Sequence, residues 1–119
     1  MKKTLVIGAS ENPDRYSNKA IRALLSHNHP VVALGIKKGS VEGIDFHTEK
    51  EQFEDIDTVT LYIGPQKQPA YYDYIIGLKP RRVIFNPGTE NPELIAQLKD
   101  TGIVSDMSCT LILLATGQY

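Results

Sequence analysis

Residues 4–17 constrain the fold of this chain more than any other stretch. The segment Thr4–Ile7 does not alternate between polar and apolar residues, which is typical of a parallel strand buried on both faces. Gly8 ends this strand, a polar loop containing Arg15 follows, and a helical pattern begins near Ser17. This order brings backbone N–H groups and a helix N-terminus together, an arrangement that suits a phosphate. The segment therefore predicts an α/β domain whose first loop binds an anion.

Strand and helix patterns alternate along the rest of the chain. Further strands are expected at residues 31–34, 58–63, 82–85 and 103–105, with a short strand or turn at 44–47. Helices are expected at residues 17–26, at 67–78, and from Pro92 until Gly102 ends the helix, with residues 107–119 forming a tail that packs on the domain. The pattern predicts a single Rossmann-like domain over residues 1–119, with three layers and a doubly wound, mainly parallel sheet.

Three residue types fix where these helices begin. Ser17 is expected to cap the first helix, and Asn91 the last, with Pro92 at its first position. Pro69 is compatible with the middle helix only in the first turn.

Ligands of doubly wound sheets bind beyond the carboxyl ends of the strands. The first such loop departs from a dinucleotide-binding fingerprint, because Ser10 and Pro13 stand where the second and third glycines belong. The loop is also longer, so it could curl around a diphosphate, with Arg15 supplying a charge-assisted contact. A surface turn with a solvated arginine is the alternative. We therefore expect a nucleotide ligand other than ordinary NAD.

The loop after the second strand is basic where an NAD enzyme has an acidic residue. Lys37 follows that strand and could hold the 2′-phosphate of NADP or the 3′-phosphate of coenzyme A. A solvated basic turn is the simpler interpretation of the same residues.

Composition restricts the remaining functions. The formal net charge of -1 argues against a nucleic-acid partner. No apolar run approaches membrane-span length, and the first strand begins too early to leave room for a signal peptide. Cys109, the single cysteine, fits a reduced, cytoplasmic protein. It lacks a neighbouring base in the sequence, and no catalytic or metal-binding constellation stands out.

The chain resembles the small stand-alone CoA-binding proteins of bacteria. These are related to the N-terminal CoA-binding domain of succinyl-CoA synthetase alpha subunits and of NDP-forming acyl-CoA synthetases. The resemblance rests on Val6–Ser17, with its Gly-Ala-Ser, its proline and its helix-opening serine. Lys37, the turn Phe85–Gly88, and Asp106 with Cys109 support it.

The resemblance implies that the first loop holds the CoA diphosphate through Ser10, neighbouring backbone and Ser17. It also implies that a basic residue after the second strand meets the adenosine phosphate. The phosphohistidine and nucleotide-grasp domains of the synthetases are missing, so ligase activity is not expected. The residues assigned to ligand binding are Gly8, Ala9, Ser10, Asn12, Pro13, Arg15, Ser17, Lys37, Asn86 and Gly88.

The leading hypothesis is a non-catalytic module that binds CoA or acyl-CoA. One alternative is an enzyme or redox sensor that uses NADP(H). Another is an interaction protein with a degenerate nucleotide site, in which the apolar run Leu111–Leu114 covers a homodimer or partner-enzyme surface.

Overall fold

One seven-stranded sheet organises the computed structural model, which describes residues 1–119. Its strands are β1 (Thr4–Ile7), β2 (Val31–Leu34), β3 (Ser40–Val41), β4 (Ile44–His47), β5 (Thr58–Leu61), β6 (Arg82–Phe85) and β7 (Val104–Asp106). Their order across the sheet is β3-β4-β2-β1-β5-β6-β7. Every neighbouring pair is parallel except β3 and β4, which are antiparallel. The mainly parallel sheet expected from the sequence is confirmed.

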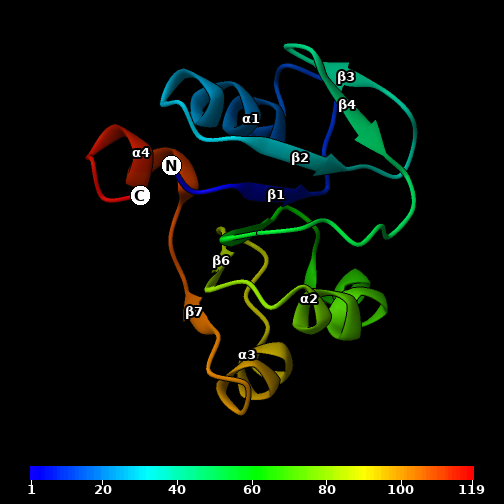
Figure 1. Ribbon diagram of the computed structural model, residues 1–119, viewed down its shortest axis with the longest axis vertical. Coiled ribbons are helices and arrows are strands. Elements are labelled where there is room, and N and C mark those ends of the chain that lie inside the picture. The colour runs from blue at the N-terminus through cyan, green and yellow to red at the C-terminus, as the bar shows by residue number, and fades with distance from the viewer.

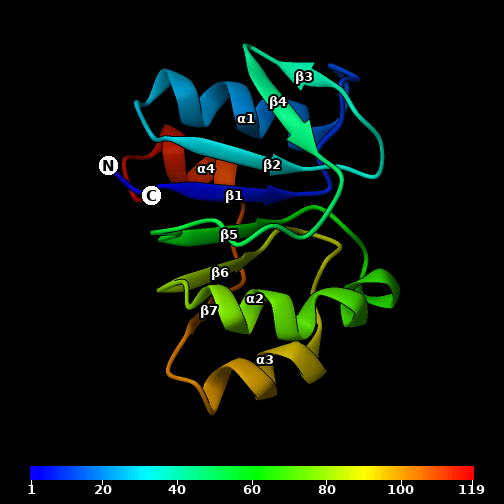
Figure 2. The same cartoon turned by 45° about the vertical axis from the view of Figure 1, so that its right-hand side comes forward.

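Helices cover both faces of this sheet (Figures 1 and 2). They are α1 (Tyr16–Ser26), α2 (Tyr72–Leu78), α3 (Pro92–Lys99) and α4 (Thr110–Ala115), with a 3-10 helix, η1 (Pro65–Tyr71), directly before α2. α1 and α4 lie on one face, and α2 and α3 on the other. The three-layer arrangement predicted from the alternating pattern is therefore confirmed.

Two apolar clusters separate the layers. Leu5 and Ile7 of β1 point to the face where Ile75 of α2 and Leu94 of α3 pack. Val6, between them in sequence, points to the opposite face. This alternation explains why β1 is buried along its whole length: each face of the central strand lies under helices.

Helix boundaries follow local chemistry, with one correction. Asn91 caps α3 as predicted, its side-chain oxygen accepting a hydrogen bond from the Leu94 N–H. The prediction that Ser17 caps α1 is wrong. Arg15 occupies the cap position, with extended backbone and no capping side-chain hydrogen bond, and Ser17 is buried as the second residue of the helix.

The middle helix is divided where the sequence placed one continuous helix. Pro69 lies inside η1, and regular α-helix begins only at Tyr72. Proline lacks an N–H and clashes with the preceding turn of an α-helix, so residues 65–71 take the tighter 3-10 form instead.

The sheet has an antiparallel edge that the sequence pattern does not predict. Glu42 and Gly43, both with positive φ (51° and 80°), form the two-residue turn between β3 and β4. Both central residues of this tight hairpin turn need positive φ.

The C-terminal tail packs on the domain, as expected. Leu114 of α4 is buried in the cluster that contains Ile21 of α1. The Tyr119 hydroxyl is 2.6 Å from Thr4 Oγ1, which places both ends of the chain at the amino edge of the sheet (Figure 1). None of the helices combines the length and the hydrophobicity that crossing a bilayer requires.

Candidate functional site

The candidate site lies at the carboxyl edge of the sheet, where the strand order reverses. β1 sits between β2 on one side and β5 on the other, so the loops that follow these strands diverge there. Ligands of doubly wound sheets bind in the crevice at such a point.

Gly8 shapes the first loop rather than offering a donor to a ligand. Its backbone has a φ of 99°, and a Cβ atom there would lie 2.7 Å from the Tyr62 carbonyl oxygen. The N–H groups of Gly8 and Ala9 both donate to the Leu34 carbonyl, at 3.0 and 2.9 Å. Only glycine fits this turn, which bends the chain away from β1.

The middle of the loop is held by its own side chains. Ser10 Oγ accepts a hydrogen bond from the Asn12 N–H at 3.1 Å. Asn12 Oδ1 accepts one from the Asp14 N–H at 2.9 Å. Pro13 and Arg15 are exposed beside them. Such local bonds fix the loop conformation before any ligand arrives.

Four backbone N–H groups of this loop have no acceptor within the protein. They belong to Ser10, Glu11, Tyr16 and Ser17. The last two are the first residues of α1, whose dipole favours an anion. The loop therefore provides backbone N–H groups that can donate hydrogen bonds to a phosphate, and no lysine lies at its centre.

The loop after β2 lies against the first loop. Glu11 Oε2 accepts a hydrogen bond from the Ser40 N–H at 2.9 Å, and a Cβ atom on Gly35 would lie 3.2 Å from the Ala9 carbonyl oxygen. Lys37 is exposed at the tip between these contacts. The structure thus brings the loops of the two predicted phosphate contacts together, with the Lys37 side chain in solvent.

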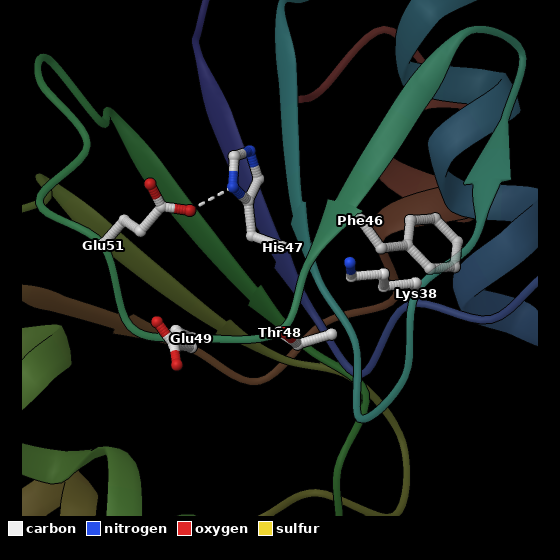
Figure 3. A pocket seen from close by; sticks show the side chains of 6 residues that line it. All are labelled: Lys38, Phe46, His47, Thr48, Glu49 and Glu51. Atoms are coloured by element: carbon white, nitrogen blue, oxygen red, sulfur yellow. Dashed lines mark hydrogen bonds and ion pairs between the residues drawn. The ribbon is translucent and has the colours of Figure 1, made fainter.

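A concavity of about 380 Å³ opens beside this second loop (Figure 3). Phe46 and Lys38 lie on one side of it, and Glu49 and Glu51 on the other. His47 projects between them and pairs with the Glu51 carboxylate. The lining of this concavity is polar and carries side chains of both charges.

Asn86 occupies the end of β6 and is fully engaged by the protein. Its amide nitrogen donates to Thr60 Oγ1 at 2.7 Å and to the Leu61 carbonyl at 2.8 Å. Its side-chain oxygen accepts a hydrogen bond from the Thr110 N–H at 2.9 Å. Gly88, two residues on, is exposed with a φ of 91°. Of this pair, Asn86 joins three elements and Gly88 forms the open turn.

A second cavity, of about 410 Å³, lies at the carboxyl ends of β5 and β6. Residues from the starts of α1 and α4 and from the ends of β5 and β6 line it: Tyr16, Tyr62, Asn86, Pro87, Cys109, Leu111 and Ile112. We name it the α4 cavity. Tyr16 also contributes one of the four free N–H groups, so this cavity begins where the first loop ends.

The α4 cavity carries no charged side chain. Burial raises the pKa of Tyr62 to about 12, so its hydroxyl stays neutral at every ordinary pH. Cys109, which the sequence left without a base, forms part of the wall and is half-buried. The sequence pattern does not single out Tyr62, because it predicts a strand that continues to residue 63. β5 ends at Leu61, which puts Tyr62 at the carboxyl edge.

Comparison with known structures reveals close relatives of this arrangement. The crystal structure of an uncharacterized protein matches with a TM-score of 0.98 and 49% identity, over 100% of this chain and 98% of that chain. A hypothetical protein from Pyrococcus horikoshii OT3 matches with a TM-score of 0.83 and 26% identity, over 93% of this chain and 80% of that one. The comparison with curated proteins found no significant match.

A larger enzyme contains a similar fold. The dinucleotide-forming acetyl-coenzyme A synthetase 1 of Candidatus Korarchaeum cryptofilum matches with a TM-score of 0.72 and 16% identity, over 87% of this chain and 25% of that chain. At this identity the match concerns the fold alone. The family model described as "CoA binding domain" matches residues 2–115. Because that match spans almost all of the sequence, this chain belongs to the CoA-binding domain family.

Proposed function

We propose that this protein binds CoA or acyl-CoA along the carboxyl edge of its sheet, as a binding module rather than as an enzyme. The observation that carries the proposal is the set of four unpaired N–H groups, on Ser10, Glu11, Tyr16 and Ser17, in a member of the CoA-binding domain family. These N–H groups have no acceptors within the protein, and the oxygens of a diphosphate can accept their hydrogen bonds.

The other residues of the first loop have distinct roles in this proposal. Gly8 and Ala9 set the turn, and Asn12 and Pro13 hold the loop in its curled form. Arg15, exposed at the start of α1, adds a positive charge beside the diphosphate. Because Arg15 is in solvent, its contribution is moderate and depends on salt.

The adenosine end of CoA is assigned to the loop after β2. Lys37 is exposed there and free to meet the 3′-phosphate. The concavity beside Lys38 and Phe46 would take the adenine ring, with the carboxylates of Glu49 and Glu51 facing its amino group. The pantetheine arm would then run the other way, past Tyr16 toward Asn86 and Gly88.

Titration calorimetry with CoA and dephospho-CoA tests this assignment. Wild-type protein should bind CoA about fivefold more tightly than dephospho-CoA, since an exposed ion pair, here between Lys37 and the 3′-phosphate, contributes up to ~1 kcal/mol. Lys37→Ala should remove that difference and leave dephospho-CoA binding unchanged. Lys99→Ala, an exposed lysine of α3, is the matched control and should retain it. Failure of wild-type protein to bind either ligand would overturn the proposal, and tighter binding of NADPH would favour the NADP(H) alternative.

A further inference from the structure

We propose that the α4 cavity holds the acyl group of an acyl-CoA, and that it selects short, apolar, uncharged acyl groups. The inference rests on the proposed function, because binding of the diphosphate at the first loop is what would bring the thioester end of the ligand to this cavity. It adds the chemical class of the acyl group, which CoA binding alone does not specify.

The position of the cavity follows from the elements that form it. Tyr16 links it to the N-terminus of α1, and Asn86 and Pro87 continue the wall along the carboxyl edge. Leu111 and Ile112 of α4 complete the wall. A ligand that extends from the first loop past Tyr16 therefore reaches α4. The volume, about 410 Å³, lies in the range of small-molecule sites, roughly 300–1,000 Å³.

Two polar groups at the cavity, the Asn86 side chain and the Thr110 N–H, already have hydrogen-bond partners within the protein. Asn86 uses both amide hydrogens and its oxygen on Thr60, Leu61 and Thr110. The Thr110 N–H is consumed by the same contact. A buried amide without partners loses the hydrogen bonds that it had in water, whereas a methylene loses none. The cavity therefore favours the hydrocarbon end of a ligand over the two amides of the pantetheine arm.

The lining also lacks a group that could balance a carboxylate. No lysine, arginine or histidine contributes to the wall, and the Tyr62 hydroxyl is neutral. A dicarboxylic acyl group would bring its charge into this environment without a counter-ion, which is unfavourable. The absence of charged side chains in the wall therefore disfavours dicarboxylic acyl groups and favours alkyl chains.

The rim exposes apolar surface that an acyl chain would cover. Ile112 is 61% exposed and Tyr16 is 68% exposed, although both lie at the cavity. The walls themselves are fixed. Thr110 Oγ1 lies 2.8 Å from Thr60 Oγ1 at the start of α4, and Leu114 anchors its other end in the core. The site is thus formed in advance, and covering its rim removes apolar surface from water.

Calorimetry with CoA, acetyl-CoA, butyryl-CoA and succinyl-CoA tests the inference. Each buried methylene should tighten binding about fourfold, so butyryl-CoA should bind about 15-fold more tightly than acetyl-CoA. Succinyl-CoA should bind at least about tenfold more weakly than butyryl-CoA. Ile112→Ser should reduce the butyryl preference and leave CoA affinity unchanged. Val104→Ser, an exposed apolar residue of β7 outside the cavity, is the control.

Alkylation of Cys109 provides an independent readout, because this single cysteine belongs to the cavity wall. Saturating butyryl-CoA should slow its reaction with N-ethylmaleimide more than saturating CoA does. Equal protection by CoA would show that the pantetheine arm fills the cavity, and would overturn the inference.

The outcomes separate the two proposals. Similar affinities for CoA and all three thioesters would overturn the acyl selectivity and leave CoA binding in place. Absence of binding to every ligand would overturn the proposed function itself. If sedimentation showed that Ile112→Ser dissociates a dimer while acyl length has no effect, the cavity would belong to a protein interface, which would also overturn the inference.

Discussion

The side-chain oxygen of Asn86 accepts a hydrogen bond from the backbone N–H of Thr110 at 2.9 Å, and thereby ties the end of β6 to the start of α4. The amide nitrogen of the same side chain donates to Thr60 Oγ1 and to the Leu61 carbonyl. One buried amide therefore links the end of β5, the end of β6 and the start of α4. These elements form the wall of the α4 cavity.

Asn86→Asp should destabilise the protein although the two side chains have the same shape. The carboxylate keeps the acceptor for Thr110 but loses both donors, and it faces the Leu61 carbonyl at a buried position. We expect a loss of about 2–4 kcal/mol in the free energy of unfolding. Urea denaturation measures it. An unchanged midpoint would show that the three bonds do not constrain the fold.

Gly8→Ala should cost more than a substitution at another glycine with nearly the same backbone. Gly88 has a φ of 91°, close to the 99° of Gly8, but a Cβ atom there would have nothing within 4 Å. Gly88→Ala should cost about 1–2 kcal/mol from backbone strain alone. At Gly8 the new methyl also meets the Tyr62 carbonyl, which adds about 1–3 kcal/mol. Equal losses in denaturation would show that the loop relaxes around the methyl.

Stability should fall on mild acidification because of His29. Burial, followed by the positive charges of the N-terminus and Lys2, lowers its pKa below 6.5, and its Nδ1 accepts the Lys2 N–H at 3.0 Å. Below pH 6.5 the unfolded chain takes up a proton that the folded protein resists. The stabilisation is therefore complete above that pH and is lost as the pH falls through the folded-state pKa.

Denaturation midpoints between about pH 7.5 and about pH 5 check this linkage. Wild-type protein should lose more stability over the interval than His29→Gln. His27→Gln, at the exposed end of α1, should keep most of the wild-type loss, because the His27 charge is a lesser cause of the lowered His29 pKa than burial. A wild-type profile that matches His29→Gln would remove His29 as the cause.

Arg15→Gln should weaken CoA binding and flatten its dependence on salt. The exposed guanidinium contributes only a screened interaction, so the expected loss is about fivefold at low ionic strength. Arg81→Gln is the matched control, because Arg81 pairs with Asp57 at the opposite edge of the sheet. Calorimetry at two salt concentrations distinguishes them. Equal effects of the two substitutions would assign Arg15 to the solvated surface.

Local sequence rules located most of the fold. The non-alternating segment of β1 and the Asn91-Pro92 cap of α3 were recognisable because short-range sterics and hydrogen bonds determine them. The hairpin between β3 and β4 was missed, since Glu42-Gly43 is a weaker signal for this turn than Asn-Gly. Ser17 was misplaced because a cap depends on where the preceding loop delivers the chain, and its hydroxyl chemistry alone does not fix that position.

The candidate site divides in the same way. The first loop and the loop that contains Lys37 were identifiable because each follows a buried strand. The α4 cavity could not be predicted from the sequence. Its wall combines Tyr62 with Cys109 and Ile112, which are far from Tyr62 in the sequence, and no local pattern shows that they lie together. Asn86 was recognised by its place after a strand, yet the sequence could not show that its side chain is already saturated by Thr60 and Thr110.

The most direct test of the account follows the backbone amide resonances of the protein by NMR during titration with CoA. The N–H groups of Ser10, Glu11, Tyr16 and Ser17 should show the largest chemical-shift changes, since they are the donors without partners. Shifts concentrated instead at the amino edge, around His29 and Tyr119, would contradict CoA binding at the carboxyl ends of the strands.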